Sequence, residues 1–308
     1  MAWKRVLIIM LLCACCFGAC AEGLEPLDMD SLAPGPAPSD ACYLSDMEYQ
    51  DESIHVRLYN GRFAKTDYVC AHVKISHPSQ LRTATSNTSF RDTSEGTIRG
   101  RIIADNVNAV VAINGDYYTK TDKCQVVLRQ SLQIRNQADG HMDLLIIDQN
   151  GDFSALPQCT KAEYKEYIRL HEHEMYNVFC FGPVLVQDGV NVIPENYANG
   201  YVGAKNKTQR SAIAQLGPLE YLLITCSGPQ SDNNEGMTIP EFAALCELTG
   251  NRLSENGCQL AFNLDGGNSA TLIFKAPDNK GGLSYVKVNC PEIERQLSDI
   301  IYFATLVK

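Results

Sequence analysis

The stretch Leu260-Ala261-Phe262-Asn263-Leu264-Asp265-Gly266-Gly267-Asn268-Ser269 decides how this chain folds around a site. It begins with apolar residues of the kind found in strands and runs directly into a cluster of Asn, Asp and Gly. Two glycines after a carboxylate let the backbone approach a ligand and turn its N–H groups toward an anion. The stretch therefore predicts a buried strand that ends in a ligand-binding loop, or simply a tight strand end.

Two other turns have the same character. Asn114-Gly115-Asp116-Tyr117-Tyr118 follows the apolar run 109–113, and Phe181-Gly182-Pro183 lies inside the run 178–186. Each turn alone is explained by a tight strand end. Three such turns in one chain, with Arg210 among them, favour a site.

Short apolar and β-branched runs bounded by Gly, Asn, Asp or Pro recur along the chain and predict further strands. They are 54–58, 68–75, 144–147, 221–225, 270–274 and 300–303. Asn150-Gly151 predicts a hairpin after residue 147. Thr238 and Glu241 form a capping box for a helix that Gly250 is expected to end, and a second helix is expected over 161–171. The predicted fold class is α+β, a mixed, sheet-dominated single domain with few helices.

The first 45 residues differ in composition from the rest. Lys4 and Arg5 precede the apolar run 6–19, and Ala19-Cys20-Ala21 follows, which is typical of a signal peptide over residues 1–21. A retained anchor and a lipid attached at Cys20 are the alternatives. Residues 22–45 are rich in proline and predict an exposed tether, which leaves 46–308 as the domain. Every version places the body outside the cytoplasm, secreted or attached to the cell envelope, with no transmembrane segment expected in it.

The body is acidic. Loss of Lys4 and Arg5 with the leader takes the formal net charge from −10 to −12, because residues 1–21 contain no acidic residue. Nucleic acid is therefore not expected as a partner, whereas one small phosphorylated ligand in a local basic pocket is compatible with this charge. Nine cysteines follow the leader without a C-x-x-C motif, so no zinc cluster is expected and the disulfide pairing stays open. Cys180, Cys226 and Cys246 lie in apolar patterns and are expected in the core.

Six motifs occur in the order found in the phosphodiester glycosidase family, which the chain resembles from about residue 68 to its C-terminus. They are Asn114-Gly115-Asp116-Tyr117-Tyr118, Phe181-Gly182-Pro183, Arg210-Ser211-Ala212-Ile213, Glu235-Gly236-Met237-Thr238, Asn263-Leu264-Asp265-Gly266-Gly267, and Glu294-Arg295 with Ser298-Asp299-Ile300.

The resemblance, which is greatest to the exported bacterial branch, implies a hydrolase that cleaves the sugar–phosphate C–O bond of a glycosyl-1-phosphodiester. The substrate would be an N-acetylglucosamine-1-phospho compound or a glycan of the wall or capsule. Two departures are Asn268, where the family commonly has a third glycine, and Ser211, where threonine is commoner.

The chemistry of such a reaction suits these residues. Cleavage at the anomeric carbon expels a phosphate monoester, which needs little protonation, so a second carboxylic acid is less necessary than in other glycosidases. We expect Arg210 to clamp the phosphate. We expect Asp265 to act as general base or nucleophile. The N–H groups of Gly266 and Gly267 would add anion stabilisation.

The remaining candidates have supporting roles. Glu235 is either a second acid or part of the entry to its helix, and Asp116 positions substrate or shapes a turn. An ion pair between Arg295 and Asp299 is expected to be structural. The other expected substrate contacts, which include amides for sugar hydroxyls and tyrosines for stacking, are Asn114, Gly115, Tyr117, Tyr118, Gly182, Pro183, Asn263 and Ser269.

No cofactor and no metal are expected. His171-Glu172-His173-Glu174 contains the only local histidine pair and is interpreted as a solvated helix end. Two other functions stay open: a metal-dependent phosphodiesterase that cuts the P–O bond, and a non-catalytic surface protein that binds glycan phosphates. In each case the partner is a glycan or a sugar phosphate.

Overall fold

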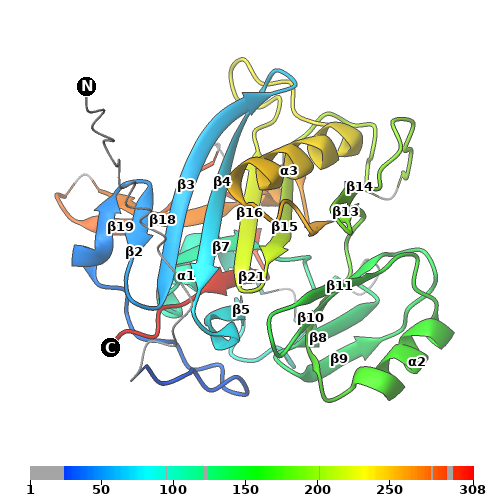
Figure 1. Ribbon diagram of the computed structural model, residues 1–308, viewed down its shortest axis with the longest axis horizontal. Helices are drawn as coiled ribbons and strands as arrows, with labels where there is room; N and C mark the ends of the chain where they lie inside the picture. The colour runs from blue at the N-terminus through cyan, green and yellow to red at the C-terminus, as the bar shows by residue number, and fades with distance from the viewer. Residues whose placement is uncertain (1–23, 95, 121–123, 201, 279, 290–293) are drawn as a thin grey trace, which may run out of the picture.

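The computed structural model describes residues 24–94, 96–120, 124–200, 202–278, 280–289 and 294–308. This part of the chain is dominated by antiparallel sheets, with three α-helices, so the expected mixed and sheet-rich α+β fold is confirmed (Figure 1).

The largest sheet has nine strands, and α3 (Ile239–Leu253) covers one of its faces (Figure 1). Across the sheet the strands follow the order β1 (Tyr43–Ser45), β2 (Glu48–Gln50), β3 (Ile54–Phe63), β4 (Thr66–Ile75), β16 (Glu220–Cys226), β15 (Arg210–Gly217), β17 (Leu260–Asn263), β13 (Val184–Gln187) and β14 (Val190–Asn191).

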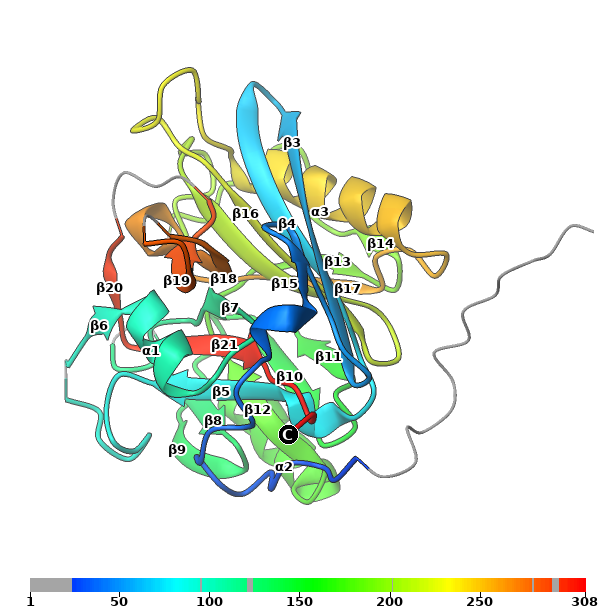
Figure 2. The same cartoon turned by 90° about the vertical axis from the view of Figure 1, so that its left-hand side faces the viewer.

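Two five-stranded sheets lie against the other side, and each has one helix packed on it (Figure 2). The first carries α1 (Gly100–Asn106) and has the order β19 (Leu283–Lys287), β18 (Leu272–Pro277), β7 (Val111–Asn114), β21 (Asp299–Phe303) and β5 (Leu81–Thr85). The second carries α2 (Lys161–His171) and has the order β11 (Phe153–Leu156), β10 (Leu144–Asp148), β12 (Met175–Phe179), β8 (Val126–Arg129) and β9 (Leu132–Asn136). The short strands β6 (Ile98–Arg99) and β20 (Gln296–Leu297) pair separately.

The three sheets share one hydrophobic core. Val56 of β3, Ile113 of β7 and Leu145 of β10 belong to the same buried cluster. Burial of each such side chain stabilises the fold by roughly 1.5–3 kcal/mol. Because this interior is continuous, the loops that follow β7 and β17 are held by a common packed body.

The local predictions hold where they rest on neighbouring residues. All nine predicted runs contain or overlap strands, and the hairpin at Asn150-Gly151 joins β10 to β11. Both predicted helices form, and the capping box predicted at Thr238 begins α3.

Two expectations about these elements are wrong. The run 178–186 is not one strand, since β12 ends at Phe179 and β13 starts at Val184. Gly250 lies inside α3 and does not end it, because a Cβ there would come within 2.6 Å of the Cys258 Cβ, and glycine allows that close packing.

The expected tether is attached to the body, although many of its residues are exposed. The buried Arg82 side chain donates from Nη1 to the carbonyl of Asp28 (3.0 Å) and from Nη2 to that of Ser31. Tyr176 donates its hydroxyl hydrogen to the Met29 carbonyl (3.0 Å). A free tether would make no such contacts, so this part of the expectation is corrected from residue 24 onward. The predicted leader and Cys20 lie outside the described residues.

Eight of the nine cysteines that follow the leader are described, and all eight are free thiols. Seven of them are buried, including Cys180, Cys226 and Cys246 as predicted. Cys290 lies outside the described residues. In the described part of the chain, no helix has both the length and the apolar character needed to span a bilayer.

Candidate active site

Three strand ends meet where the nine-stranded sheet approaches the β7 sheet. Strand β7 ends at Asn114, β17 ends at Asn263, and β21 begins at Asp299. Ladder pairing of Asn114 with Ile300 holds β7 beside β21. The polar clusters that follow β7 and β17 therefore come together, as their shared pattern suggested.

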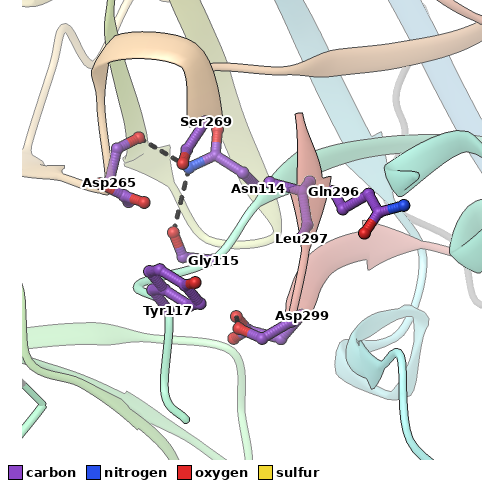
Figure 3. Close-up of a pocket in the computed structure, with 9 residues that line it drawn as sticks. Asn114, Gly115, Tyr117, Asp265, Ser269, Gln296, Leu297 and Asp299 are labelled. Carbon is purple, nitrogen blue, oxygen red and sulfur yellow. Dashed lines mark hydrogen bonds between the residues drawn. The ribbon is translucent and has the colours of Figure 1, made fainter. Parts of the chain in front are cut away.

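The Asn114 side chain links these loops. Its Nδ2 donates to the carbonyls of Gly115 (3.0 Å) and Asp265 (2.8 Å), as Figure 3 shows. Its Oδ1 accepts from Ser211 Oγ (2.7 Å) and from the Thr271 amide (3.0 Å). Since two N–H donors and two lone pairs complete a primary amide, the Asn114 side chain has no capacity left for a sugar hydroxyl. The expected sugar contact is replaced by a structural role.

Nine residues around this junction line a small hollow that opens to solvent and has a cavity volume of about 10 Å³, room for one water molecule, which we call the Asp265 pocket. They are Asn114, Gly115, Tyr117, Asp265, Ser269, Gln296, Leu297, Ser298 and Asp299 (Figure 3). The first five are among the predicted site residues. The last four come from the motif around residue 298. The sequence predicts a role for only one of them, Asp299, as a member of a structural ion pair.

Asp265 is held firmly at the edge of the pocket. Its backbone carbonyl accepts from Asn114 Nδ2 and from Ser211 Oγ (3.3 Å). Its side chain lines the pocket and is partly exposed. A carboxylate on a fixed backbone beside a solvent-accessible hollow has the arrangement of a nucleophile or general base.

Asp299 faces the same pocket but is buried in an ion triad. Arg129 Nη2 lies 2.6 Å from Asp116 Oδ1 and 3.2 Å from Asp299 Oδ2, and none of the three side chains is more than 1% exposed. Burial, opposed by the charge of Arg129 and assisted by that of Asp116, raises the pKa of Asp299 to about 6. The expected Arg295–Asp299 ion pair is therefore wrong, because Asp299 pairs with Arg129.

Asp116, from the loop after β7, is the third member of this triad. Its Oδ2 accepts the Cys180 amide hydrogen at 2.9 Å, and its side chain is fully buried. It does not line the pocket, so a direct contact with substrate is corrected to a supporting position behind Asp299.

Arg295 lies at the exposed rim of the Asp265 pocket and is not part of the buried ion triad. Its Nη1 donates to Ser269 Oγ (3.3 Å), and its guanidinium lies 5.4 Å from the centre of the Tyr117 ring. The residue is exposed, and no carboxylate of the described residues lies within 4.0 Å of its guanidinium. Arg295 therefore has donors available toward solvent at the mouth of the pocket.

Arg210, the predicted phosphate clamp, serves the fold. Its Nε donates to the Met237 carbonyl (3.0 Å) and its Nη1 to that of Val202 (2.9 Å). Its Nη2 donates to the carbonyls of Gly203 and Asn206, both at 2.8 Å. Burial lowers the pKa of Arg210 to about 10. With four backbone partners and 3% exposure, Arg210 cannot form a bidentate clamp, and that expectation is wrong.

Glu235 lies away from the pocket. Its carboxylate accepts from Lys65 Nζ and from Lys207 Nζ, both at 2.9 Å. The hydrogen bond from Lys207, followed by that from Lys65, lowers the pKa of Glu235 to about 2. A carboxylate that stays ionised on the surface cannot serve as the second acid. The other predicted role of Glu235, as part of the entry to its helix, agrees with these contacts.

The glycines after Asp265 pack closely against the start of β15. Gly267, with φ +58°, donates its N–H to the Gln209 carbonyl (2.9 Å), and a Cβ on Gly266 would lie 2.8 Å from the same oxygen. The Gly267 N–H is thus already paired inside the protein. The expected anion site at Gly267 is corrected to close backbone packing, while Gly266 does not line the pocket.

Four other predicted contacts, Asn263, Gly182, Pro183 and Tyr118, are internal. Asn263 Nδ2 donates to the Gly182 carbonyl (2.7 Å), and the Asn263 amide donates to the Pro183 carbonyl (3.0 Å), so this buried joint fixes β17. Tyr118 is fully buried, and its hydroxyl contacts Thr85 Oγ1 (2.8 Å) and donates to the Asp92 carbonyl (3.1 Å). Only Tyr117 presents a ring to the pocket.

Sequence reasoning missed Arg129, Gln296, Leu297 and Ser298. Arg129 follows the apolar run 126–128, and Asp299 precedes the apolar run 300–303. A charged residue next to a buried run is the same signal that identified Asp265. Asp299 lies at the amino end of its strand, and the run 126–128 before Arg129 is not among the predicted strands, so neither residue follows a predicted strand.

Comparison with known proteins bears on this site. Residues 107–304 match the phosphodiester glycosidase family. No protein among the curated ones compared with the chain matches it.

Several solved structures are similar, of which two are described. The zebrafish N-acetylglucosamine-1-phosphodiester alpha-N-acetylglucosaminidase catalytic domain, auto-inhibited by its pro-peptide, is 14% identical, with a TM-score of 0.58 over 88% of this chain and 87% of that one. A hypothetical protein from Synechocystis is 15% identical, with a TM-score of 0.52 over 82% of this chain and 62% of that one. At these identities the likeness concerns the fold.

Proposed function

The chain belongs to the phosphodiester glycosidase family, and from that premise we propose that it hydrolyses the C–O bond between a sugar and the phosphate of a glycosyl-1-phosphodiester. The observation that carries the proposal is the Asp265 pocket, where one carboxylate faces a hollow whose rim holds Arg295. The similar zebrafish enzyme acts on an N-acetylglucosamine-1-phosphodiester, and we propose the same class of substrate here.

Asp265 attacks or activates water at the anomeric carbon. Its side chain is partly exposed while its backbone is fixed by Asn114 and Ser211, so the carboxylate meets substrate without a loop movement. The departing group is a phosphate monoester, which leaves with little help from an acid. One reactive carboxylate therefore suffices for the bond that breaks.

Arg295 replaces Arg210 as the phosphate-binding cation of this proposal. A guanidinium presents paired donors to phosphate oxygens, and an exposed one at the pocket mouth meets a charged group as it enters. The Tyr117 ring, beside Arg295, supplies an apolar face for the sugar. The sugar would then lie against the Tyr117 ring at the mouth of the hollow, while the phosphate binds Arg295 at the rim.

The proposal also covers where the protein works. The leader over residues 1–21 stays a prediction from the sequence, with lipid attachment at Cys20 as an alternative, and so does the extracytoplasmic location that both imply. A wall or capsule glycan that carries sugar-1-phosphodiesters is the natural substrate that such a location favours.

The first test is hydrolysis of UDP-N-acetylglucosamine and of an N-acetylglucosamine-1-phosphodiester of mannose in water enriched in oxygen-18. We expect the label in the released sugar. Asp265→Asn should lower kcat by about 10²–10⁴-fold, the usual contribution of a positioned acid or base. The exposed Asp46 supplies the matched control, since Asp46→Asn makes the same chemical change far from the pocket and should leave kcat unchanged.

The same assay tests Arg295. Arg295→Gln should raise KM about tenfold or more through loss of charge-assisted hydrogen bonds, whereas Arg57→Gln, on an exposed part of β3, should not. Label in the phosphate would replace the proposed reaction with P–O cleavage by a phosphodiesterase. Binding of both compounds without turnover would point to a binding protein.

A further inference from the structure

A second and larger hollow lies on the α3 side of the nine-stranded sheet, and among the described residues it shares no lining side chain with the Asp265 pocket. Three parts of the chain form its walls: the tip of the β3–β4 hairpin at 63–64, the first turns of α3 at 238–244, and the segment 195–205. We call it the α3 groove. Its cavity volume is about 760 Å³, within the range of about 300–1,000 Å³ that small-molecule sites usually have.

Polar contacts hold these walls in place. Lys65, at the tip of the hairpin, lies 2.9 Å from the carboxylate of Glu235, just ahead of α3. The Ile239 amide donates to the Ala204 carbonyl (2.9 Å), which joins the segment 195–205 to the first turn of α3. Arg210 donates to two further carbonyls of that segment. Because the walls are tied together, the groove exists before a ligand arrives, and binding there orders little of the protein.

The lining of the α3 groove combines aromatic rings with available charged groups. Phe63 and Tyr197 are partly buried, and both pack against the hydrophobic cluster beneath α3 while lining the groove. Glu195 and Lys205 also line it, are exposed, and form no ion pair with any described residue. An occupant must therefore offer an apolar surface to the rings together with polar groups that both donate and accept hydrogen bonds.

The charges around the groove largely cancel. Glu195 and Lys205 have opposite signs, and Lys207 Nζ lies 3.2 Å from Glu241 Oε1 and so offsets the second carboxylate of the lining. A surface without a strong field of one sign does not concentrate ions, so the groove favours neither a phosphate nor a cation. The occupant that this lining fits is a neutral molecule.

Two other classes of occupant fit less well than a sugar. An acyl chain would take Glu195 and Lys205 out of water without giving either of them a hydrogen bond, which costs free energy. A peptide strand would need unpaired main-chain groups along a wall, but the carbonyls of 202–204 already accept hydrogen bonds within the protein. A sugar meets both demands of the lining, because its ring has an apolar face and its hydroxyls donate and accept.

We infer that the α3 groove is a second carbohydrate-binding site, which holds a neutral stretch of a glycan against Phe63 and Tyr197. Its place in the fold suits a polymeric ligand. Arg210 at the start of β15 donates to the wall of the groove, and the next residue, Ser211, donates to the Asp265 carbonyl. Successive side chains of a strand point to opposite faces, so the two sites lie on opposite sides of one strand end. A glycan held in the groove stays close to the Asp265 pocket, which raises its effective concentration there.

Isothermal titration calorimetry with neutral tetrasaccharides tests this site without any turnover. The probes are N-acetylchitotetraose, cellotetraose, maltotetraose and mannotetraose, which differ in linkage and in their acetamido groups. We expect at least one of them to bind. Its Kd should change less than about twofold between about 0.05 M and 0.5 M sodium chloride, because salt screens charges and these sugars have none.

Matched variants then locate the bound sugar. Tyr197→Ala should weaken binding about tenfold through loss of a stacking face. Glu195→Gln, at an exposed position that does not hold the fold, should weaken it severalfold because a charge-assisted hydrogen bond is lost. Tyr117→Ala makes the same change as Tyr197→Ala at the Asp265 pocket, and Tyr167→Ala makes it on α2. Both should leave the Kd unchanged.

Three results would overturn the inference. The first is that no tetrasaccharide binds with a Kd below about 10 mM. The second is that Tyr117→Ala weakens binding and Tyr197→Ala does not, because the sugar would then occupy the Asp265 pocket. The third is that dodecanoate binds and Tyr197→Ala abolishes its binding, which would assign the groove to acyl chains. Failure of the proposed function would look different, because wild type would then bind the sugar but release none from a phosphodiester.

Discussion

Arg210 and Arg295 show how much the surroundings of a single side chain decide. Arg210 is almost fully buried and donates to four backbone carbonyls, which organises the chain between Val202 and Asn206 around the start of β15. Arg295 is exposed and donates to one side chain, Ser269. The same guanidinium group is a structural anchor at position 210 and an available cation at position 295.

We predict that Arg210→Met will lower the free energy of unfolding by about 3 kcal/mol or more. The change leaves several buried carbonyls without a donor, and each orphaned group costs about 1–3 kcal/mol. Denaturant titration measures the loss, and Arg57→Met on the exposed part of β3 is the control, with little expected change. An Arg210→Met protein of wild-type stability with a raised KM would restore the phosphate-clamp role.

At the scale of elements, the site depends on where strands end. Strand β7 stops at Asn114, and the next residue, Gly115, passes under the carboxyl group at the start of β21. The Asp299 carbonyl accepts the Gly115 amide hydrogen at 3.1 Å, so backbone and side chain of Asp299 both contact this one residue. Glycine is required here for the close approach of two elements.

We predict that Gly115→Ala will disturb this contact. A Cβ at that position would lie 2.2 Å from Asp299 Oδ2 and 2.5 Å from its Cγ, so the carboxyl group, which also pairs with Arg129, must shift. Overpacking of this kind costs roughly 1–3 kcal/mol. We expect a lower unfolding temperature together with a raised KM for the phosphodiester.

The matched control for that change is Gly200→Ala. Gly200 is exposed, and a Cβ there would meet nothing within 4 Å, so both stability and KM should stay at wild-type values. If Gly115→Ala behaved like Gly200→Ala, the close contact between β7 and β21 would have no importance for the pocket.

At the scale of the whole molecule, stability comes from packing and not from cross-links in the described residues. One buried cluster joins the nine-stranded sheet to both five-stranded sheets. Eight described cysteines are free, and the buried ones have thiol pKa values raised by burial, for example to about 12 at Cys226. A thiol with a raised pKa forms little thiolate and reacts slowly with oxidants.

We therefore predict that reducing agent leaves the unfolding temperature within about 1 °C of its value without reductant, since loss of a structural disulfide would typically cost 2–5 kcal/mol. Differential scanning calorimetry with and without dithiothreitol makes the comparison, and thiol labelling after unfolding counts the free cysteines. A fall of several degrees in the unfolding temperature under reduction would contradict this prediction and reveal a stabilising disulfide bond.

The sequence by itself determined the features that depend on neighbouring residues. Short apolar runs bounded by Gly, Asn and Asp marked the strands, and the capping box at Thr238 marked the start of α3. Caps and strand periodicity act over a few residues, so they are legible in a single chain. The same local signal placed Asp265, Ser269 and Tyr117 at the pocket.

Only the tertiary structure decided which polar groups remain available. Asn114, Asn263 and Arg210 have the right chemistry for a substrate, but partners far along the chain occupy most of their donors and acceptors. Conversely, the pKa of Asp299 is raised by its burial in the core, with Asp116 from another element adding to the rise and Arg129 opposing it. Hydrogen-bond saturation and the pKa of a buried acid are set by contacts between distant segments, which no local pattern contains.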